Sequence, residues 1–373
     1  MKRSKTSIVD SIADGQWSRR DFVSALGAAG LGVAAVPVVS GRALGSSGIR
    51  YFTWSGYEDP AFHKKFTEKH GDVQNFTYFP DEESGLQKLR AGFSADLAHP
   101  CTYAVPRWRD AGVIEPIDTS RLSNYANVWQ GLQDMEIAKS DGKTWFVPFD
   151  WGNSSVLFRT DLVDPKYQEE HTWEIMWDEA YKGRLGMYDS VDGAVIVAGL
   201  MAEVEDPFNM SDDELDAARN LLRAQNKILR FWWQDNTTVE QGLASGELVA
   251  AYAWNSSVVA LKKQGLPVEY MNPKEGILCW VCGLVKISSG EADEQVAYDM
   301  IDSMLDPMAG KYMIEEWGYG HANKLAFDLV EPALLADRGL SDPNALFEQG
   351  VFLDEISRRE KYEEMFTEVK AGL

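Results

Sequence analysis

The segment Ile49–Gly56 has the sequence IRYFTWSG and decides the fold. β-Branched and aromatic residues dominate its first six positions and the Ser-Gly pair ends the run, so the segment predicts a strand that stops at Trp54. Helix and strand patterns then alternate, with a helix expected at 60–70, a strand at 73–79, a helix at 85–91 and a short strand at 96–98. This alternation predicts a parallel sheet covered by helices.

The same alternation returns in the second half of the chain. Residues 183–188 and 246–254 have strand composition, and residues 296–305 repeat apolar side chains at helical spacing. Ser211 and Glu214 form a capping box that opens another helix, because their side chains can bind backbone N–H groups that the helix leaves free. For 373 residues, two α/β units are the economical interpretation.

The overall charge excludes several partners. The chain carries 58 Asp and Glu against 36 Lys and Arg, a net charge of −22 at pH 7. We therefore expect no binding to nucleic acid or to anionic membranes, since both require a basic face. Three cysteines are too few for a fold that depends on disulfides.

The N-terminal residues 1–43 have the pattern of a cleaved export signal. The paired arginines Arg19-Arg20 precede an apolar run, Val23–Val39, and a small-residue site ends at Ala43, as in twin-arginine signals. The alternative is a membrane anchor, but the run has 17 residues and contains Pro37, which is short for a span of about 20 residues. No later stretch is long and apolar enough to cross a bilayer, so we expect a periplasmic protein.

Motifs of catalysis and metal binding are missing from the sequence. It contains no phosphate-binding loop, no His-Glu-x-x-His helix and no Gly-x-Ser-x-Gly elbow, so we expect neither an enzyme nor a bound cofactor or metal. His63 and His70 are expected in solvent on one helix. Cys279 and Cys282 have the spacing of a redox pair but lie in a strand-like segment, where residues three apart are about 10 Å apart, too far for a disulfide.

Aromatic residues stand where several predicted strands end. Trp54, Tyr103 and Trp254 occupy such positions, and the chain has 13 tryptophans. Open parallel sheets bind ligands at the carboxyl ends of their strands, and aromatic faces attract cations. Most tryptophans of a globular protein pack in its core, but several at strand ends indicate a site for a cation.

These features resemble the periplasmic spermidine/putrescine-binding proteins, which are solute receptors of ABC importers. The resemblance covers nearly all of the chain after the export signal, and the order and spacing of its landmarks carry it. The landmarks are residues 51–57, 96–103, 147–152, 173–177 with 181–183, 246–255, 273–276, 318–319 and 362–372.

The resemblance implies an α/β, two-lobed periplasmic binding protein fold. Each lobe would be a mixed, mostly parallel sheet flanked by helices, with a hinge between the lobes and a central ligand cleft. The implied N-terminal lobe is 44–152 plus 281–327, the C-terminal lobe is 157–276 plus 332–373, and the hinge crossings lie near 153–156, 277–280 and 328–331. The implied partners are a small cationic amine and the permease subunits of an ABC transporter, and the protein would be a monomer.

The positions that line the ligand cleft in this family can be matched one by one to residues of this sequence. The family's aromatic positions fall on Trp54, Tyr57, Tyr103, Trp254, Trp280 and Tyr319. The complete set of expected ligand-binding residues is Trp54, Ser55, Tyr57, Cys101, Tyr103, Ser190, Asp192, Gln234, Trp254, Trp280, Cys282 and Tyr319.

The family's ligand acids are replaced in this sequence. Ser190 and Gly193 stand at the positions of an Asp and a Glu that hold ammonium groups, while Asp189 and Asp192 are each one position away. By the same resemblance, Cys282 replaces a further Asp, and Cys101 stands where the family has Ser or Thr. These two cysteines could face the cleft as free thiols or paired with each other.

The sequence therefore leaves two classes of ligand open. A polyamine would be bound if Asp189 or Asp192 turned into the cleft, and this is our leading expectation. The alternative is a smaller or quaternary ammonium solute held mainly by aromatic rings. Two other functions are weaker: a ferric-ion receptor, which needs a pair of adjacent tyrosines that the sequence lacks, and an exported thiol enzyme using Cys101 or Cys282.

Overall fold

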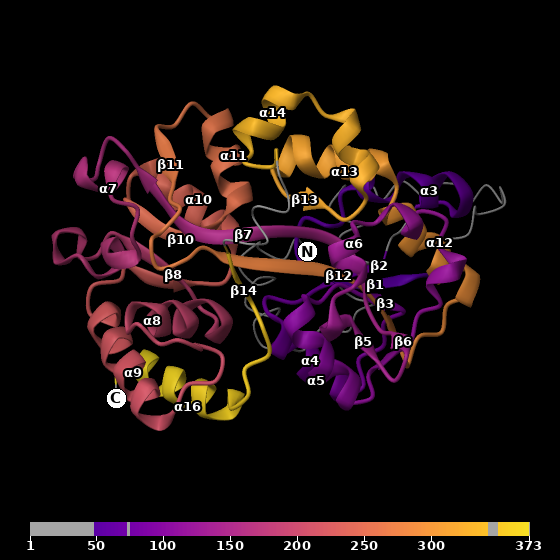
Figure 1. Cartoon of the computed structure of the whole chain (residues 1–373), viewed down its shortest axis with the longest axis horizontal. Coiled ribbons are helices and arrows are strands. Elements are labelled where there is room, and N and C mark those ends of the chain that lie inside the picture. The colour runs from indigo at the N-terminus through magenta and orange to yellow at the C-terminus, as the bar shows by residue number, and fades with distance from the viewer. Residues whose placement is uncertain (1–47, 73–74, 342–349, 373) are drawn as a thin grey trace, which may run out of the picture. The chain divides into compact units, whose positions relative to one another are not determined.

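A single twisted sheet runs through the molecule and carries both halves of the chain (Figure 1). The computed structural model describes residues 48–72, 75–341 and 350–372, all within one compact unit, Leu44–Leu373. The predicted export signal, residues 1–43, lies outside the described residues. Within the described part of the chain, no helix is both long enough and apolar enough to cross a membrane.

Eight strands form the main path of the sheet. Their order is β2 (Asn75–Tyr78), β1 (Arg50–Thr53), β3 (Leu97–Ala98), β12 (Leu278–Ile287), β7 (Val147–Arg159), β10 (Ala250–Trp254), β8 (Leu185–Tyr188) and β9 (Phe231–Trp233). The shorter strands are β4 (Ile114–Glu115), β11 (Val268–Tyr270), β13 (Gly320–His321) and β14 (Val351–Phe352), with a separate hairpin of β5 (Lys139–Ser140) and β6 (Lys143–Thr144).

The sheet consists of two parallel blocks joined by two long antiparallel strands. β1 pairs in parallel with β2 and β3 in the N-terminal lobe, and β8 pairs in parallel with β9 and β10 in the C-terminal lobe. β7 and β12 pair with each other in antiparallel fashion and run side by side across the middle of the molecule (Figure 1). The expectation of a parallel sheet in each half is confirmed.

Helices cover both faces of this sheet (Figure 1). The α-helices are α3 (Lys64–His70), α4 (Glu82–Arg90), α5 (Val105–Asp110), α6 (Gln130–Gln133), α7 (Lys166–Glu169), α8 (Ile196–Met201), α9 (Asp212–Asn226), α10 (Asn236–Ser245), α11 (Asn255–Lys263), α12 (Glu294–Met304), α13 (Pro307–Tyr312), α14 (Pro332–Asp337) and α16 (Arg359–Lys370). The short 3₁₀ turns include η1 (Pro60–His63), η2 (Thr102–Ala104) and η10 (Lys324–Leu329), and the π-helical turns are η8 (Val191–Val195) and η9 (Met313–Trp317).

Local sequence explains two features of this frame. The capping box of Ser211 and Glu214 is present at the start of α9, as predicted. In β12 the register shifts between Cys282 and Gly283, and only glycine fits there, because a Cβ on Gly283 would lie 2.2 Å from the carbonyl oxygen of Val147.

The predicted division into lobes can be followed along the chain. The expected crossings at 153–156 and 277–280 lie in β7 and at the start of β12, and that at 328–331 spans the end of η10. The boundaries of the lobes and the hinge positions stay predictions.

The prediction for His63 was wrong. The side chain is only 2% exposed, and Nε2 lies 2.7 Å from the carbonyl oxygen of Tyr57. The helix starts with the 3₁₀ turn η1, so His63 does not share the helical register of His70, and it packs against Tyr51 and Phe76. His70 is half-buried against Asp299 at 2.7 Å.

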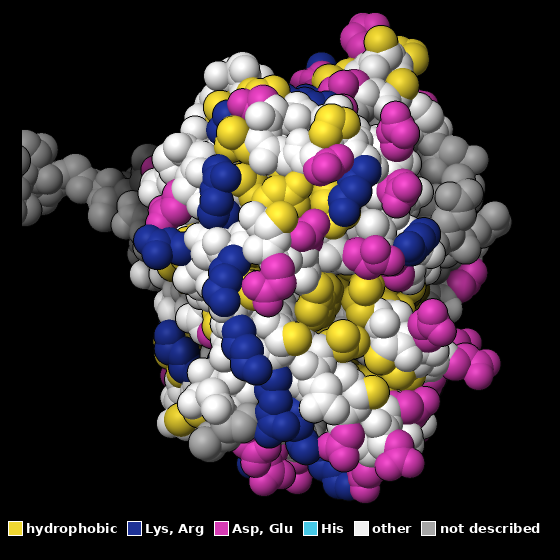
Figure 2. Space-filling view, turned by 90° about the vertical axis from the view of Figure 1, so that its left-hand side faces the viewer, with side chains coloured by type: hydrophobic (Ala, Val, Ile, Leu, Met, Phe, Trp, Pro, Cys, Tyr) yellow, Lys and Arg dark blue, Asp and Glu magenta, His cyan; other side chains and the backbone are white. Residues whose placement is uncertain are grey.

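Charges of both signs meet on the C-terminal lobe. Figure 2 shows Lys and Arg side chains in a column along one side of this face, with Asp and Glu gathered along the other side and at the bottom. Some basic residues of this lobe are paired, as Arg230 is with Glu247 at 2.6 Å. The net negative charge is therefore unevenly spread.

Candidate functional site

One large cavity lies where the strands of both lobes end. Its volume is about 620 Å³, large enough for a small organic molecule. β1 leads into Trp54, the loop after β3 carries Cys101 and Tyr103, and β10 ends at Trp254. The carboxyl ends of parallel strands thus converge on this cavity, which is the general position of ligand sites in open α/β sheets.

The predicted site residues come together around this cavity with one exception. Those that line it are Trp54, Ser55, Tyr57, Cys101, Tyr103, Asp192, Gln234, Trp254, Trp280, Cys282 and Tyr319. Ser190 does not line it; its hydroxyl accepts the backbone N–H of Asp192 at 3.2 Å and caps the turn η8. Whether the lining residues contact a ligand stays a prediction.

Aromatic rings from both lobes meet at the cavity. The rings of Trp54 and Trp254 are 6.5 Å apart, edge to face, although the two residues follow strands of different lobes. Trp280 packs edge to face on Tyr319 at 4.8 Å, and the ring of Tyr57 lies 4.9 Å from that of Trp317. Such rings present the negative faces that attract an organic cation.

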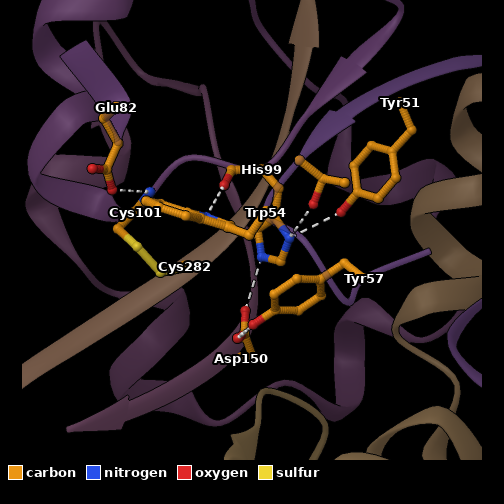
Figure 3. Close-up of a disulfide and its surroundings, with 9 residues drawn as sticks. Tyr51, Trp54, Tyr57, Glu82, His99, Cys101, Asp150 and Cys282 are labelled. Carbon is orange, nitrogen blue, oxygen red and sulfur yellow. Dashed lines mark hydrogen bonds and ion pairs between the residues drawn. A yellow bond between two sulfur atoms is a disulfide. The ribbon is translucent and has the colours of Figure 1, made fainter. Parts of the chain in front are cut away.

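A buried polar network holds Tyr57 and Trp54 in place (Figure 3). The Tyr57 hydroxyl donates to the carboxylate of Asp150, and His99 Nε2 lies 2.9 Å from the same carboxylate. His99 Nδ1 lies 2.9 Å from the Tyr51 hydroxyl, and the indole N–H of Trp54 donates to the carbonyl oxygen of His99 at 2.8 Å. Burial, with the nearby charge of Asp150, raises the pKa of Tyr57 well above its ordinary value, so this hydroxyl stays neutral.

Cys101 and Cys282 form a disulfide in the cavity wall (Figure 3). Of the two alternatives that the sequence left open, the structure has the paired one, and the two residues also form an isolated antiparallel bridge. The third cysteine, Cys279, is buried in β12, and burial raises the pKa of its thiol to about 12. None of the three is a reactive thiolate at neutral pH in this state.

The two acids next to the family's ligand positions are both held by basic side chains of this chain. Asp192 forms a buried ion pair with Arg359 of α16, and Asp189 binds Lys370 of the same helix at 2.5 Å. Asp189 does not line the cavity. An ammonium group entering at this end would therefore find Asp192 already neutralised.

The Asp192–Arg359 pair predicts a large effect on stability and a matched control. Changing Asp192 to Asn leaves a buried guanidinium whose remaining counter-ion among the described residues is Glu363, at 3.7 Å, and we expect a loss of about 2 kcal/mol in the free energy of unfolding. Changing Asp189 to Asn breaks a more exposed pair and should cost less than about 1 kcal/mol. Urea denaturation of both variants tests this prediction. Equal losses in the free energy of unfolding would show that the buried pair stabilises the fold no more than the exposed pair does.

Several lining residues were not identified from the sequence. Tyr188 and Trp317 line the cavity; Tyr188 ends a predicted strand, which was a usable signal. Glu240, in the middle of α10, also lines it, and nothing in its local sequence marks it. Among the residues that the structure describes, no group of three or more His, Cys, Asp or Glu side chains is placed to hold a metal ion.

Comparisons with known proteins agree with this geometry. The family model of the bacterial extracellular solute-binding proteins matches residues 61–338. The spermidine/putrescine-binding periplasmic protein of Escherichia coli K12 is 26% identical over 364 residues, covering 96% of this chain and 99% of its own. The putrescine/agmatine-binding protein of Pseudomonas aeruginosa is 23% identical over 306 residues, 77% of this chain and 81% of its own.

A solved structure supports the fold. A putative spermidine/putrescine ABC transporter protein from Listeria monocytogenes superposes with a TM-score of 0.76 at 21% identity, over 86% of this chain and 98% of its own. This likeness confirms the two-lobed periplasmic binding protein fold. The names of these relatives are those of solute-binding and transport proteins. With a family model matched over most of its length, the chain belongs to the bacterial extracellular solute-binding proteins.

Proposed function

We propose that the protein is an extracytoplasmic receptor that binds a small organic amine and delivers it to an ABC permease. The observation that carries this proposal is the cavity wall, in which aromatic rings of both lobes stand together with carboxylates and with no Lys, Arg or His among the described lining residues. A wall of this composition favours a cation and repels an anion. The curated relatives named above bind polyamines, which are cations of this class.

The lobes already touch across the cavity. The hydroxyl of Tyr188, at the end of β8, donates to the carbonyl oxygen of Pro80, before α4, at 3.1 Å. Closure of two lobes over a ligand excludes water, and this strengthens the attraction between a cation and the surrounding rings. The proposed receptor therefore gains affinity from closure.

The disulfide supports the proposed location outside the cytoplasm. Disulfides persist in oxidising compartments such as the periplasm and are rare in the cytosol. Export through the twin-arginine route, action as a monomer and lack of affinity for nucleic acid remain parts of the proposal that rest on the sequence.

Ligand binding should raise the melting temperature of the purified protein. At a concentration 100 times its dissociation constant, a ligand adds about 2.7 kcal/mol to the free energy of unfolding, which shifts the midpoint by several degrees. Putrescine, spermidine, choline and glycine betaine form the test panel, and 1,4-butanediol is an uncharged control of similar size. We expect a shift and a change in tryptophan fluorescence with at least one amine, and none with the diol. A protein that responds to no amine would contradict the proposal.

A further inference from the structure

A buried carboxyl group lies directly behind the cavity wall. Glu82, the first residue of α4, is 3% exposed and does not itself line the cavity. It accepts the backbone N–H of Cys101 at 3.4 Å (Figure 3) and forms a side-chain hydrogen bond with Tyr103. Both Cys101 and Tyr103 line the cavity. A single layer of residues therefore separates Glu82 from a molecule bound there.

Several elements place charged or titratable groups around Glu82. These groups are Asp81 and Glu83 on α4 and its N-cap, Tyr103 on η2, Arg107 on α5, Tyr188 on β8, Asp192 on η8, and Arg359 and Glu363 on α16. The two basic side chains are engaged with other acids, Arg107 with Glu83 at 2.5 Å and Arg359 with Asp192. Within the described ranges, Glu82 has no basic partner.

Glu82 is the group at this end of the cavity whose charge can change near neutral pH. Burial, and next the negative charge of Asp192, raise its pKa to about 7. Tyr103 and Tyr188 stay neutral, because burial raises the pKa of each well above its ordinary value. Asp192 is held in a buried ion pair by Arg359. With the cavity empty, Glu82 is therefore largely protonated below pH 7.

A cation in the cavity changes this balance. An opposite charge within about 4–6 Å lowers the pKa of a carboxyl group by about 1–3, and the effect is stronger where little water screens it. Ionised Glu82 therefore attracts a bound cation more strongly than protonated Glu82 does. By linkage, loss of the proton and binding of the cation favour each other by the same factor.

We propose that a cationic ligand in the cavity releases the proton of Glu82 to the solvent, so that the receptor binds its ligand more tightly as the pH rises. This inference rests on the proposed function and adds a regulation to it, because it requires a cationic ligand. A carboxyl group in this place supplies negative charge when the cavity is full. When the cavity is empty it is uncharged, which avoids the cost of a buried charge without a partner.

The affinity for simple amines at different pH values measures this coupling. Choline has a permanent positive charge, and the ammonium groups of putrescine, like that of Lys, titrate near pH 10, so neither probe changes its charge between pH 5 and pH 8. By isothermal titration calorimetry, we expect the association constant to be about tenfold higher at pH 8 than at pH 5. This factor corresponds to a pKa of Glu82 that is lower by about one in the complex than in the free protein.

The released proton can be measured directly. At pH 7, the heats of binding in phosphate and in MOPS buffer, which differ in their enthalpy of ionisation, should differ by the amount expected for release of about 0.4 proton per molecule bound. Equal heats in the two buffers would contradict the coupling.

Glu82→Gln keeps the side chain in an uncharged form. We expect this variant to bind the probes at pH 8 about tenfold more weakly than the wild type, and at pH 5 within about twofold of it. Glu83→Gln is the matched control on the same helix and should keep the tenfold dependence on pH, because Glu83 is paired with Arg107. Glu240 also lines the cavity, and burial raises its pKa, so a smaller dependence that persists in Glu82→Gln belongs to Glu240.

Three outcomes decide the matter. Equal association constants at pH 5 and pH 8, or the same pH dependence in the wild type and Glu82→Gln, would overturn this inference and leave the proposed function standing. If neither probe bound at any pH, this inference would fall, and the thermal panel of four amines would decide separately whether the proposed function falls with it.

Discussion

Replacing Cys101 and Cys282 together by serine is expected to lower the free energy of unfolding by about 3–5 kcal/mol. The disulfide closes a loop between residues 181 positions apart, so it removes a large number of conformations from the unfolded chain. It also joins β12 to the segment after β3, which carries Cys101 and Tyr103 at the cavity. Urea denaturation followed by tryptophan fluorescence measures the change.

The matched control for the disulfide is Cys279→Ser. It makes the same substitution on the same strand three residues away, where the cysteine has no disulfide partner, and should cost about 1 kcal/mol. The wild-type protein in dithiothreitol should have the same urea midpoint as the double serine variant. The oxidised protein, once denatured, should have one free thiol per chain that reacts with a thiol reagent. An unchanged midpoint in the double variant, or three free thiols, would contradict the disulfide and its role.

The location of the site could be predicted because it depends on local sequence. Trp54 and Trp254 stand at the ends of segments that have a clear strand composition. The carboxyl ends of parallel strands meet at one edge of a sheet. The alternation of strand and helix patterns predicted two α/β units with parallel sheets, and the two-lobed form came from the resemblance to the spermidine/putrescine-binding proteins. No knowledge of distant contacts was needed for either conclusion.

The chemistry of the site could not be predicted in the same way, because it depends on pairs that are remote in the sequence. Arg359 neutralises Asp192 across 167 positions, so counting acids near the family's ligand positions overstated the negative charge available to a ligand. Glu240 was not identified from the sequence, so at this position the negative charge of the cavity was underestimated. Its local sequence resembles any exposed helix, and only the packing of α10 against β10 brings it to the cavity.

His63 shows the limit of helical periodicity at a helix start. A 3₁₀ turn has about three residues per turn instead of 3.6, so a short one before α3 rotates the preceding residues relative to the helix. The proline at the start of η1 favours this end of the helix without fixing its type. His63 is therefore buried because of the 3₁₀ turn before α3, which the pattern of residues does not predict.

The second large effect is a dependence of stability on pH through Glu82. This carboxyl group is 3% exposed and lies behind the cavity wall, where it accepts the N–H of Cys101 at 3.4 Å (Figure 3). Burial, and next the negative charge of Asp192, raise its pKa to about 7, although a hydrogen bond with Tyr103 opposes the shift. The folded protein therefore holds a proton here that the unfolded chain releases near pH 4.5.

Because the pKa is higher in the folded state, stability from this group is complete below pH 4.5 and is lost as the pH rises through 7. The shift corresponds to about 3 kcal/mol in the free energy of unfolding between pH 4.5 and pH 8. Glu82→Gln keeps a hydrogen-bond acceptor for Cys101 without the charge, so it should flatten this dependence and make the protein more stable than the wild type at pH 8. Glu83→Gln, the next residue of α4, removes a more exposed acid paired with Arg107 and should leave the slope unchanged. Urea denaturation at pH 5, 6.5 and 8 measures the free energy of unfolding of the wild type and of Glu82→Gln. If this free energy changed with pH in parallel for the two proteins, Glu82 would not change its ionisation on folding.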